Sequence, residues 1–403
     1  MTLESFLAKK QLLLNSPEKN VLALFFTVKI LLLVFVLLFY ETIPFSQRDY
    51  DVNSDHFHGQ AQSRLEMGLS PYDGPQYLDI AYFGYPKIGK TDSKKFAFFP
   101  LYPALIKIFA PIFSHNFTLS GVIISFISHL FGAIFFFKLL IFDKKETKSA
   151  FSSLKYFLIY PTALFFFSVY TESLFFLLSV LTVYLLRQKK WWLAGMVGFL
   201  GALTRPPGIL LFIPFIIEFF LYLREIKIKN FLRLKIREKI SIFAPFLIPL
   251  GTFSYFVYLY LAIGNFNAYF DALSYWKKSA ISLKNLFNVL FDKISHFNDL
   301  PLHSFYSSKL DLVFGLAFIL LLLVFWKKIR FSYFAYGLAL VILPLLSGQT
   351  MSLMRYLSVC FPVFMILGNL GAKNKVLDVF ISTFSLLLLA IFSLKLFNWY
   401  WIG

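Results

Sequence analysis

The apolar run VLALFFTVKILLLVFVLLFY at residues 21–40 decides the class of fold. It holds a single charged side chain, Lys29. As an α-helix this run is about 30 Å long, which matches the hydrocarbon thickness of a bilayer. A secretory signal peptide requires a small-residue cleavage site of the A-x-A kind, and none follows the run. The run therefore predicts an uncleaved first transmembrane helix.

About ten further apolar segments of helical length follow this run. The whole chain, residues 1–403, is therefore expected to be one all-α integral membrane domain, a polytopic bundle of about 11 transmembrane helices. Prolines at Tyr160-Pro161 and Arg205-Pro206-Pro207 are expected to end or kink helices, as happens where helices line a cavity. The segments lie near residues 118–141, 154–169, 172–186, 191–204, 207–222, 241–262, 309–325, 331–346, 355–371 and 376–394.

Composition and charge support the same class. Hydrophobic residues make up 58% of the chain and charged residues 15%, whereas soluble domains carry roughly 25% charged residues. The net charge of +18 comes largely from Lys and Arg in short connections such as 144–148 and 327–330. This pattern indicates cytoplasmic anchors beside anionic membrane lipid, and no nucleic-acid partner is expected. The N-terminus is expected on the cytoplasmic side.

Two long connections, 41–117 and 263–308, then lie on the outer face. The first is too long to be structureless, so we expect short helices that lie on the membrane surface. Its segment DVNSDHFH at residues 51–58 contains Asp55, His56 and His58, but the spacing fits no strong metal signature. We predict no metal site. The tail from Trp399 to Trp401 is expected to be an interfacial aromatic anchor.

The strongest local signal is a carboxylate beside a short helix in this outer connection. In YDGPQYLDIAYFGYP, residues 72–86, Asp73 precedes a predicted helix whose apolar face is Tyr77, Ile80, Ala81 and Gly84. The aromatic segment FAFFPLYP, residues 96–103, follows. Asp73 is either a helix N-cap or a general base that removes a proton from a hydroxyl at the mouth of a membrane cavity.

These segments resemble the membrane mannosyltransferase family related to the enzyme that adds the second mannose of GPI anchors, within the GT-C superfamily. That family has a Trp-Asp pair, a Tyr-Leu-x-Ile-Ala-x-x-Gly-Tyr stretch and an Ala-Phe-Phe-Pro-Leu-x-Pro stretch. Tyr72 stands here in place of the tryptophan, and the carboxylate is retained. Further similar elements follow in the family's order: YPTA at 160–163, VYTESLF at 169–175, LTRPPG at 203–208, and Arg355-Tyr356 followed by Phe361-Pro362.

The resemblance implies a GT-C-type bundle that takes a sugar, mannose in the family, from a polyprenyl-phosphate donor. The acceptor is a hydroxyl of a glycan, lipid or protein on the outer face, and the reaction inverts the anomeric carbon. Asp73 is then the catalytic base. No cofactor beyond the lipid-linked donor is implied, and the compact chain favours a bacterial inner (plasma) membrane.

Five other residues are predicted to bind substrate: Glu172, Arg205, Arg355, Asp79 and Tyr77. Both arginines suit a departing phosphate. Each arginine is alternatively an interfacial anchor or a partner of Glu172. Glu172 either binds sugar hydroxyls, orients Arg205, or simply begins a helix.

Three competing functions remain. A secondary transporter or lipid flippase accounts for broken helices and intramembrane charge, although the chain has no internal repeat. A protein O-mannosyltransferase or lipid-A sugar transferase of the same superfamily shares the role of Asp73 and differs in acceptor. A purely structural membrane protein leaves the ordered motifs unexplained.

Overall fold

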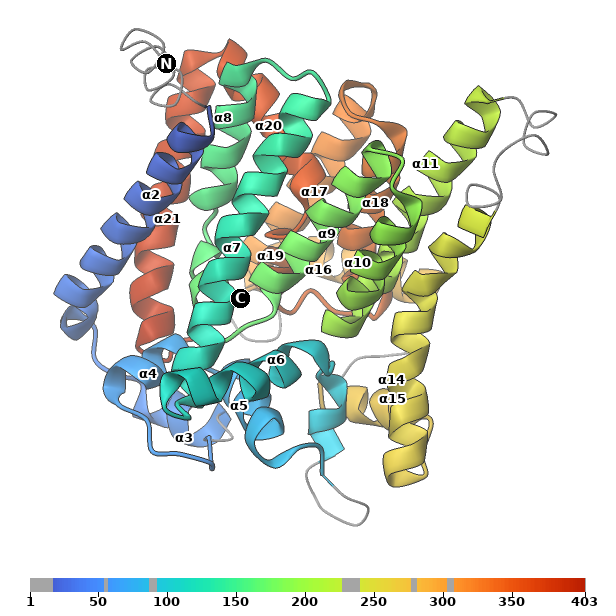
Figure 1. Ribbon diagram of the computed structural model, residues 1–403. Helices are drawn as coiled ribbons and strands as arrows, with labels where there is room; N and C mark the ends of the chain where they lie inside the picture. Colours follow the sequence, from blue (N-terminus) through green and yellow to red (C-terminus); the bar gives the residue numbers. More distant parts are fainter. Residues whose placement is uncertain are drawn as a thin grey trace, which may run out of the picture.

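The computed structural model describes residues 17–53, 57–86, 93–226, 240–276, 281–302 and 308–402. This part of the chain is helical and contains no strand, which confirms the all-α class (Figure 1). Six helices in it are long and apolar enough to cross a membrane, as expected of a multi-pass membrane protein. The larger number of about 11 crossings stays a prediction. The six are Glu18–Thr42, Phe117–Phe142, Pro206–Glu225, Ser241–Ile263, Lys309–Lys328 and Lys375–Phe397.

Four shorter apolar helices, here called the half-helices, pack among these long ones. They contain 13 to 16 residues, so each is about 20–24 Å long and falls short of a bilayer core of roughly 30 Å. All four have one terminus at the same end of the bundle, and the other terminus of each lies within the bundle (Figure 1). They are α9 (Glu172–Arg187), α10 (Trp191–Thr204), α18 (Phe331–Leu346) and α20 (Phe361–Lys373).

Proline accounts for several of the interruptions. The apolar segment 154–169 is not one helix, because α8 (Thr147–Leu158) ends before Pro161 and a 3-10 turn (Ala163–Phe167) follows. The segment 355–371 is likewise divided into α19 (Leu353–Leu357) and α20, with Pro362 in the first turn of α20. Proline has no N–H to donate within a helix, so it is tolerated mainly in the first turn.

A layer of short helices covers one end of the bundle, as expected for the connection 41–117 (Figure 1). We call it the loop layer. It comprises α3 (Gln47–Asn53), α4 (Arg64–Leu69), α5 (Asp73–Phe83) and α6 (Leu101–Phe109). From the second long connection, α15 (Ala268–Leu273) packs against the 3-10 segment Ser93–Ala97 of the first.

The helix predicted after Asp73 is present as α5, and its apolar face is largely as expected. Tyr77, Ile80 and Ala81 are buried. Gly84 does not belong to this face, because it ends the helix with a φ of +80°. Glycine adopts positive φ without steric cost, so its position here is that of a helix stop.

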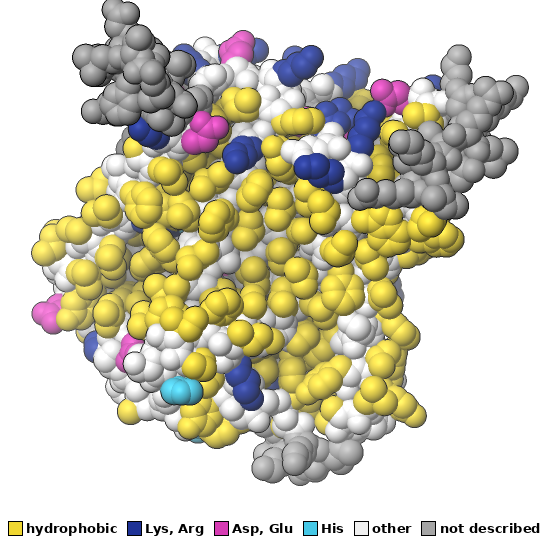
Figure 2. Space-filling model, viewed as in Figure 1, with side chains coloured by type: hydrophobic (Ala, Val, Ile, Leu, Met, Phe, Trp, Pro, Cys, Tyr) yellow, Lys and Arg dark blue, Asp and Glu magenta, His cyan; other side chains and the backbone are white. Residues whose placement is uncertain are grey.

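The face of the molecule shown in Figure 2 divides into an apolar band and two ends. The band is broad, and most Lys and Arg side chains on this face lie at the end opposite the loop layer. We call that end the basic end. It includes the connections 143–146, 188–190 and 326–330. This distribution agrees with the positive-inside rule if the basic end faces the cytoplasm, and the orientation remains a prediction.

Candidate functional site

A cavity of about 210 Å³ lies where the half-helices stop beneath the loop layer. Its polar wall comes from the start of α9, the end of α10, α19 and the start of α5. Its apolar wall comes largely from α18 and α15, for example Leu343 and Leu273. The polar lining residues are Asp73, Tyr77, Thr171, Glu172, Arg205, Tyr269, Ser347, Ser352, Arg355 and Tyr356.

The position of Asp73 is fixed by contacts with distant segments. It is the first residue of α5, and Tyr72 before it has a φ of +52°. A non-glycine residue rarely adopts this conformation and needs support from its surroundings. The Tyr72 hydroxyl donates to the Trp399 carbonyl at 2.6 Å. The Tyr170 hydroxyl accepts from the Asp73 backbone N–H at 3.2 Å and donates to the Pro71 carbonyl at 2.8 Å.

Glu172 and Arg205 occupy opposite kinds of helix end. Glu172 is the first residue of α9 and Arg205 directly follows α10, so the helix dipoles favour both charges. Pro206 and Pro207 begin the next turn, in which Gly208 fits tightly against α10. A β-carbon at Gly208 would lie 2.2 Å from the carbonyl oxygen of Gly201. The LTRPPG motif therefore has a physical reason: it stops α10 and turns the chain so that Arg205 lines the cavity.

Arg355 lies on the five-residue helix α19, which a buried carboxylate holds in place. Asp311, 3% exposed, accepts the Met354 backbone N–H at 2.8 Å and the Ser308 hydroxyl at 2.8 Å. Ser352, just before α19, has a φ of +58°. The turns that present Asp73 and Arg355 thus each begin at a residue in an uncommon backbone conformation, a feature that concentrates at functional sites.

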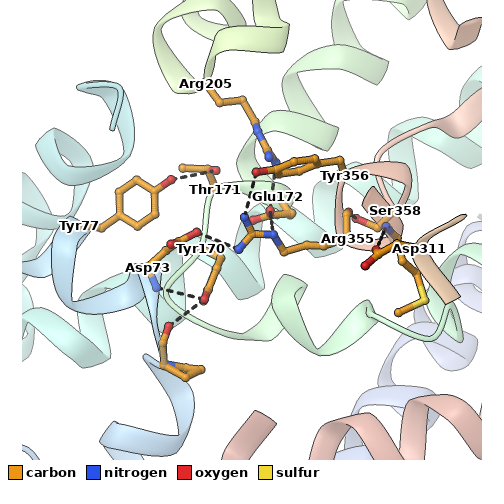
Figure 3. A network of polar contacts seen from close by, with 12 residues as sticks. Asp73, Tyr77, Tyr170, Thr171, Glu172, Arg205, Asp311, Arg355, Tyr356 and Ser358 are labelled. Atoms are coloured by element: carbon orange, nitrogen blue, oxygen red, sulfur yellow. Dashed lines mark hydrogen bonds and ion pairs between the residues drawn. The ribbon is translucent and has the colours of Figure 1, made fainter. Parts of the chain in front are cut away.

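The four charged residues form a chain of alternating sign, here called the ion network (Figure 3). Arg205 Nη1 lies 3.1 Å from Glu172 Oε1, and Arg355 Nε lies 3.5 Å from the same oxygen. Arg355 Nη1 donates to Asp73 Oδ2 at 2.8 Å. Neither arginine extends to the surface, since Arg205 is 8% and Arg355 5% exposed. The predicted pairing of an arginine with Glu172 is therefore present, and interfacial anchoring is not.

The ion network does not use all of its hydrogen-bonding capacity. Glu172 Oε2 is buried and has no hydrogen-bond partner among the described residues. Arg205 Nη1 and Arg355 Nε are ion-paired with Glu172 Oε1 but without hydrogen-bond geometry. Buried polar atoms usually form full hydrogen bonds, so a network with this spare capacity suits a polar ligand. The net formal charge of the network is zero, because two carboxylates face two guanidinium groups.

Aromatic rings restrict the two arginines. The Tyr356 ring centroid lies 5.4 Å from Arg205 Cζ and 5.1 Å from Arg355 Cζ. The Trp401 ring lies 5.7 Å from Arg355 Cζ. These distances are within the range of cation–π attraction. The rings therefore help to hold both guanidinium groups in place beside Glu172 and Asp73.

Tyr77 adds a hydroxyl to the polar wall. Its oxygen lies 3.4 Å from Thr171 Oγ1. Burial raises the pKa of Tyr77 well above its usual value, and the charges of Asp73 and Glu172 raise it further. The hydroxyl therefore stays protonated at physiological pH and can donate a hydrogen bond to a ligand.

Five of the six predicted site residues thus line one cavity, and Asp79 does not. Sequence reasoning missed Tyr356 and Thr171 as lining residues, although both lie inside motifs quoted above. It also misplaced the aromatic tail. Trp399 is fully buried against Tyr72 and Trp401 lines the cavity, so these rings are not an interfacial anchor.

Asp79 holds the loop layer together from the opposite side of α5. It is 1% exposed and accepts the His58 backbone N–H at 3.0 Å. Its Oδ2 atom lies 3.0 Å from His58 Nδ1 and accepts from Lys95 Nζ at 3.0 Å. These contacts join three separate stretches of the connection 41–117.

We expect Asp79→Asn to lower stability by about 1–3 kcal/mol, because the buried Lys95 ammonium and the His58 ring lose a charged acceptor. The measurement is the thermal unfolding midpoint of the purified protein. Asp51→Asn, an exposed site in the same layer, is the matched control. An Asp79→Asn protein as stable as that control would show that Asp79 does not hold the layer.

No metal ligation can be assigned at residues 51–58. Asp55 and His56 lie outside the described residues, and His58 contacts Asp79. Within the described ranges, no group of three or more His, Cys, Asp or Glu residues is close enough to hold a metal ion. The absence of a metal stays a prediction.

No model of a known protein family matches this chain, and neither does any curated protein. The likeness to the membrane mannosyltransferases therefore rests on the quoted motifs. Asp73, Glu172, Arg205 and Arg355 come from four of those motifs, and the fold brings them into one ion network.

Proposed function

We propose that the chain is a membrane glycosyltransferase. It transfers a sugar, mannose by family resemblance, from a polyprenyl-phosphate donor to an acceptor hydroxyl on the outer face of a membrane. The observation that carries the proposal is one cavity lined by Asp73 and two buried arginines, of which Arg355 contacts Asp73 at 2.8 Å. A base and a phosphate-binding cation are the two groups that this reaction needs within reach of one substrate.

The two walls of the cavity suit the two parts of such a donor. A polyprenyl phosphate has an anionic phosphate and a long apolar tail. Arg205 and Arg355 supply the cations on one wall, and Leu340, Leu343 and Leu273 line the other. A soluble nucleotide sugar has no apolar tail to place against such a wall.

The proposed reaction is a single displacement. The acceptor oxygen attacks the anomeric carbon while its proton passes to Asp73, and the bond between that carbon and the phosphate oxygen breaks. The electron pair leaves with the polyprenyl phosphate, whose charge Arg205 and Arg355 stabilise. Attack opposite to the leaving group inverts the anomeric carbon.

The contact between Asp73 and Arg355 gives this reaction an order. In the structure Arg355 donates to the carboxylate that is proposed to act as the base, at 2.8 Å. A donor phosphate competes for the same guanidinium group and frees the Asp73 carboxylate for the acceptor hydroxyl. The proposal therefore has donor binding before acceptor binding.

A transporter or lipid flippase is the second candidate, and the half-helices favour it. Helices that stop within the bundle and present charged residues at their ends are typical of secondary transporters. The outcome of one assay separates the two functions, because a transporter forms no new glycosidic bond.

The test is transfer of radiolabelled mannose from polyprenyl-phosphate mannose by the purified protein, with membrane lipid extract, oligosaccharides and peptides as acceptors. We expect a labelled product to form with release of polyprenyl phosphate. If no product forms with this donor or with other polyprenyl-phosphate sugars, while the labelled lipid moves across sealed vesicles, the chain is a flippase and the enzyme proposal is wrong.

A further inference from the structure

A second cavity lies at the basic end, on the far side of the bundle from the ion network. Its volume is about 400 Å³, within the range of roughly 300–1,000 Å³ that small-molecule sites occupy. It lies between the turn after α7 (Phe117–Phe142), the last residue of α9, and the connection from α17 (Lys309–Phe325) to α18. We call it the basic pocket.

The lining of the basic pocket is strongly cationic. Six basic side chains line it, against one carboxylate, that of Asp143. The basic residues are Lys144, Lys145, Arg187, Lys327, Lys328 and Arg330.

The nearby carboxylates are already used by the two arginines. Asp143 accepts from Arg187 Nε at 2.9 Å and from the Tyr333 hydroxyl at 2.6 Å, one bond to each oxygen. Glu218, behind the pocket wall, accepts from Arg330 at 2.9 Å and 3.0 Å. Each arginine charge is therefore compensated within the protein.

The four lysines are not compensated in this way. Within the described residues, none of them makes an ion pair with a carboxylate. Lys145 instead donates to the backbone carbonyl of Lys328 at 3.0 Å. Burial lowers the pKa of Lys145, and the charges of Lys373 and Lys328 lower it further against the opposing charge of Asp143. Like charges are thus held close together around one hollow.

Helix ends and the positive-inside rule explain part of this charge. Helix α7 ends at Phe142 and α9 at Arg187, and a cation in or just after the last turn of a helix is favourable. Lysines that serve only as anchors need no shared cavity and are better placed apart, because they repel one another. Four lysines from two connections surround one cavity, and this arrangement suits an anion that bridges them.

We propose that the basic pocket binds a phosphate group, with Lys144, Lys145 and Lys328 as its principal donors. Lysine and arginine both donate to phosphate oxygens, and basic pockets between transmembrane helices recognise lipid phosphates. The phosphate comes either from an anionic phospholipid headgroup in the adjoining leaflet or from a soluble phosphate. The exposed rings of Phe142 (42%) and Trp326 (41%) at these helix ends give a lipid an apolar surface beside the pocket. The inference is independent of sugar transfer.

The test measures the thermal unfolding midpoint and the dissociation constant of the purified full chain with two probes. One probe is phosphatidylglycerol in phosphatidylcholine nanodiscs, and the other is inorganic phosphate in neutral detergent. The test variant is Lys144→Gln/Lys145→Gln/Lys328→Gln. Its matched control is Lys148→Gln/Lys190→Gln/Lys375→Gln, which removes the same charge from exposed positions at the same end.

We expect the unfolding midpoint of the wild type to rise when a probe is added. In the test variant the dissociation constant for that probe should be about a hundredfold higher than in the wild type. The control variant should behave like the wild type. Without any probe, the test variant should be at least as stable as the wild type, since charge repulsion is relieved. A response to phosphatidylglycerol identifies a lipid headgroup, and a response to inorganic phosphate identifies a soluble ligand. No response to either probe, or equal loss in both variants, would overturn the proposal.

Discussion

Asp73→Asn is expected to lower the turnover number for sugar transfer by about 10²–10⁴-fold, the contribution of a positioned general base. The amide oxygen can still accept from Arg355, so the contact that now measures 2.8 Å keeps a donor and an acceptor. The amide cannot take a proton from the acceptor hydroxyl. The measurement is transfer of radiolabelled mannose under saturating donor and acceptor.

The matched control for this variant is again Asp51→Asn. It makes the same chemical change in the loop layer, at an exposed carboxylate that contacts Gln47 and not the cavity. The control should show the wild-type unfolding midpoint, and Asp73→Asn a somewhat lower one because Arg355 loses a charged partner, so turnover is compared per folded protein. If Asp73→Asn turns over within a few-fold of the control, Asp73 is not the base. Sugar transfer by the wild type would still support the proposal that the protein is a glycosyltransferase.

Arg355→Lys is expected to lower kcat/KM for the lipid-linked donor by about 10²–10³-fold. The reason is that losing one partner of a buried charge pair costs several kcal/mol of binding free energy. Lysine keeps the charge but loses the planar fork that now reaches both Asp73 and Glu172. The KM for the acceptor should change much less. Initial rates measured while each substrate is varied in turn separate the two effects.

Arg64→Lys serves as the matched control for Arg355→Lys. Arg64 donates to the Phe397 carbonyl at 3.0 Å and lies over the Phe45 ring, in the loop layer and outside the cavity. Arg355→Ala is a poorer test, because it leaves two buried carboxylates short of a partner and is expected to destabilise the fold. If donor and acceptor KM rise equally in Arg355→Lys, the arginine does not act on the donor phosphate.

Local signals in the sequence were sufficient to predict the class of fold and most helix boundaries. Apolar runs of helical length predicted the helices, and prolines predicted the breaks at Tyr160-Pro161 and after Thr204. Helical geometry could also have predicted that Asp73 and Asp79 do not belong to the same site. They are six residues apart on α5, which is about 240° around the helix, so the two carboxylates cannot share a face.

Contacts between distant segments could not be predicted in this way. Arg355 and Asp73 are 282 residues apart, and the Tyr72–Trp399 contact spans 327 residues. Aromatic residues near the end of a membrane protein usually mark the lipid interface, which made an anchor the natural expectation for Trp399 and Trp401. Only the folded chain places them against Tyr72 and the cavity.

The ion network also restricts how the sequence can change over generations. Glu172 and Arg355 each touch two oppositely charged neighbours. Losing Glu172 leaves Arg205 without a counter-charge, losing Arg355 leaves Asp73 without one, and losing either end member leaves the network with a net charge. Such a loss is costly alone and much less costly when a second member changes with it, so the effects of substitution are not additive. Descendants of this chain are therefore expected to keep all four charges or to replace them in pairs, with few viable single-step intermediates.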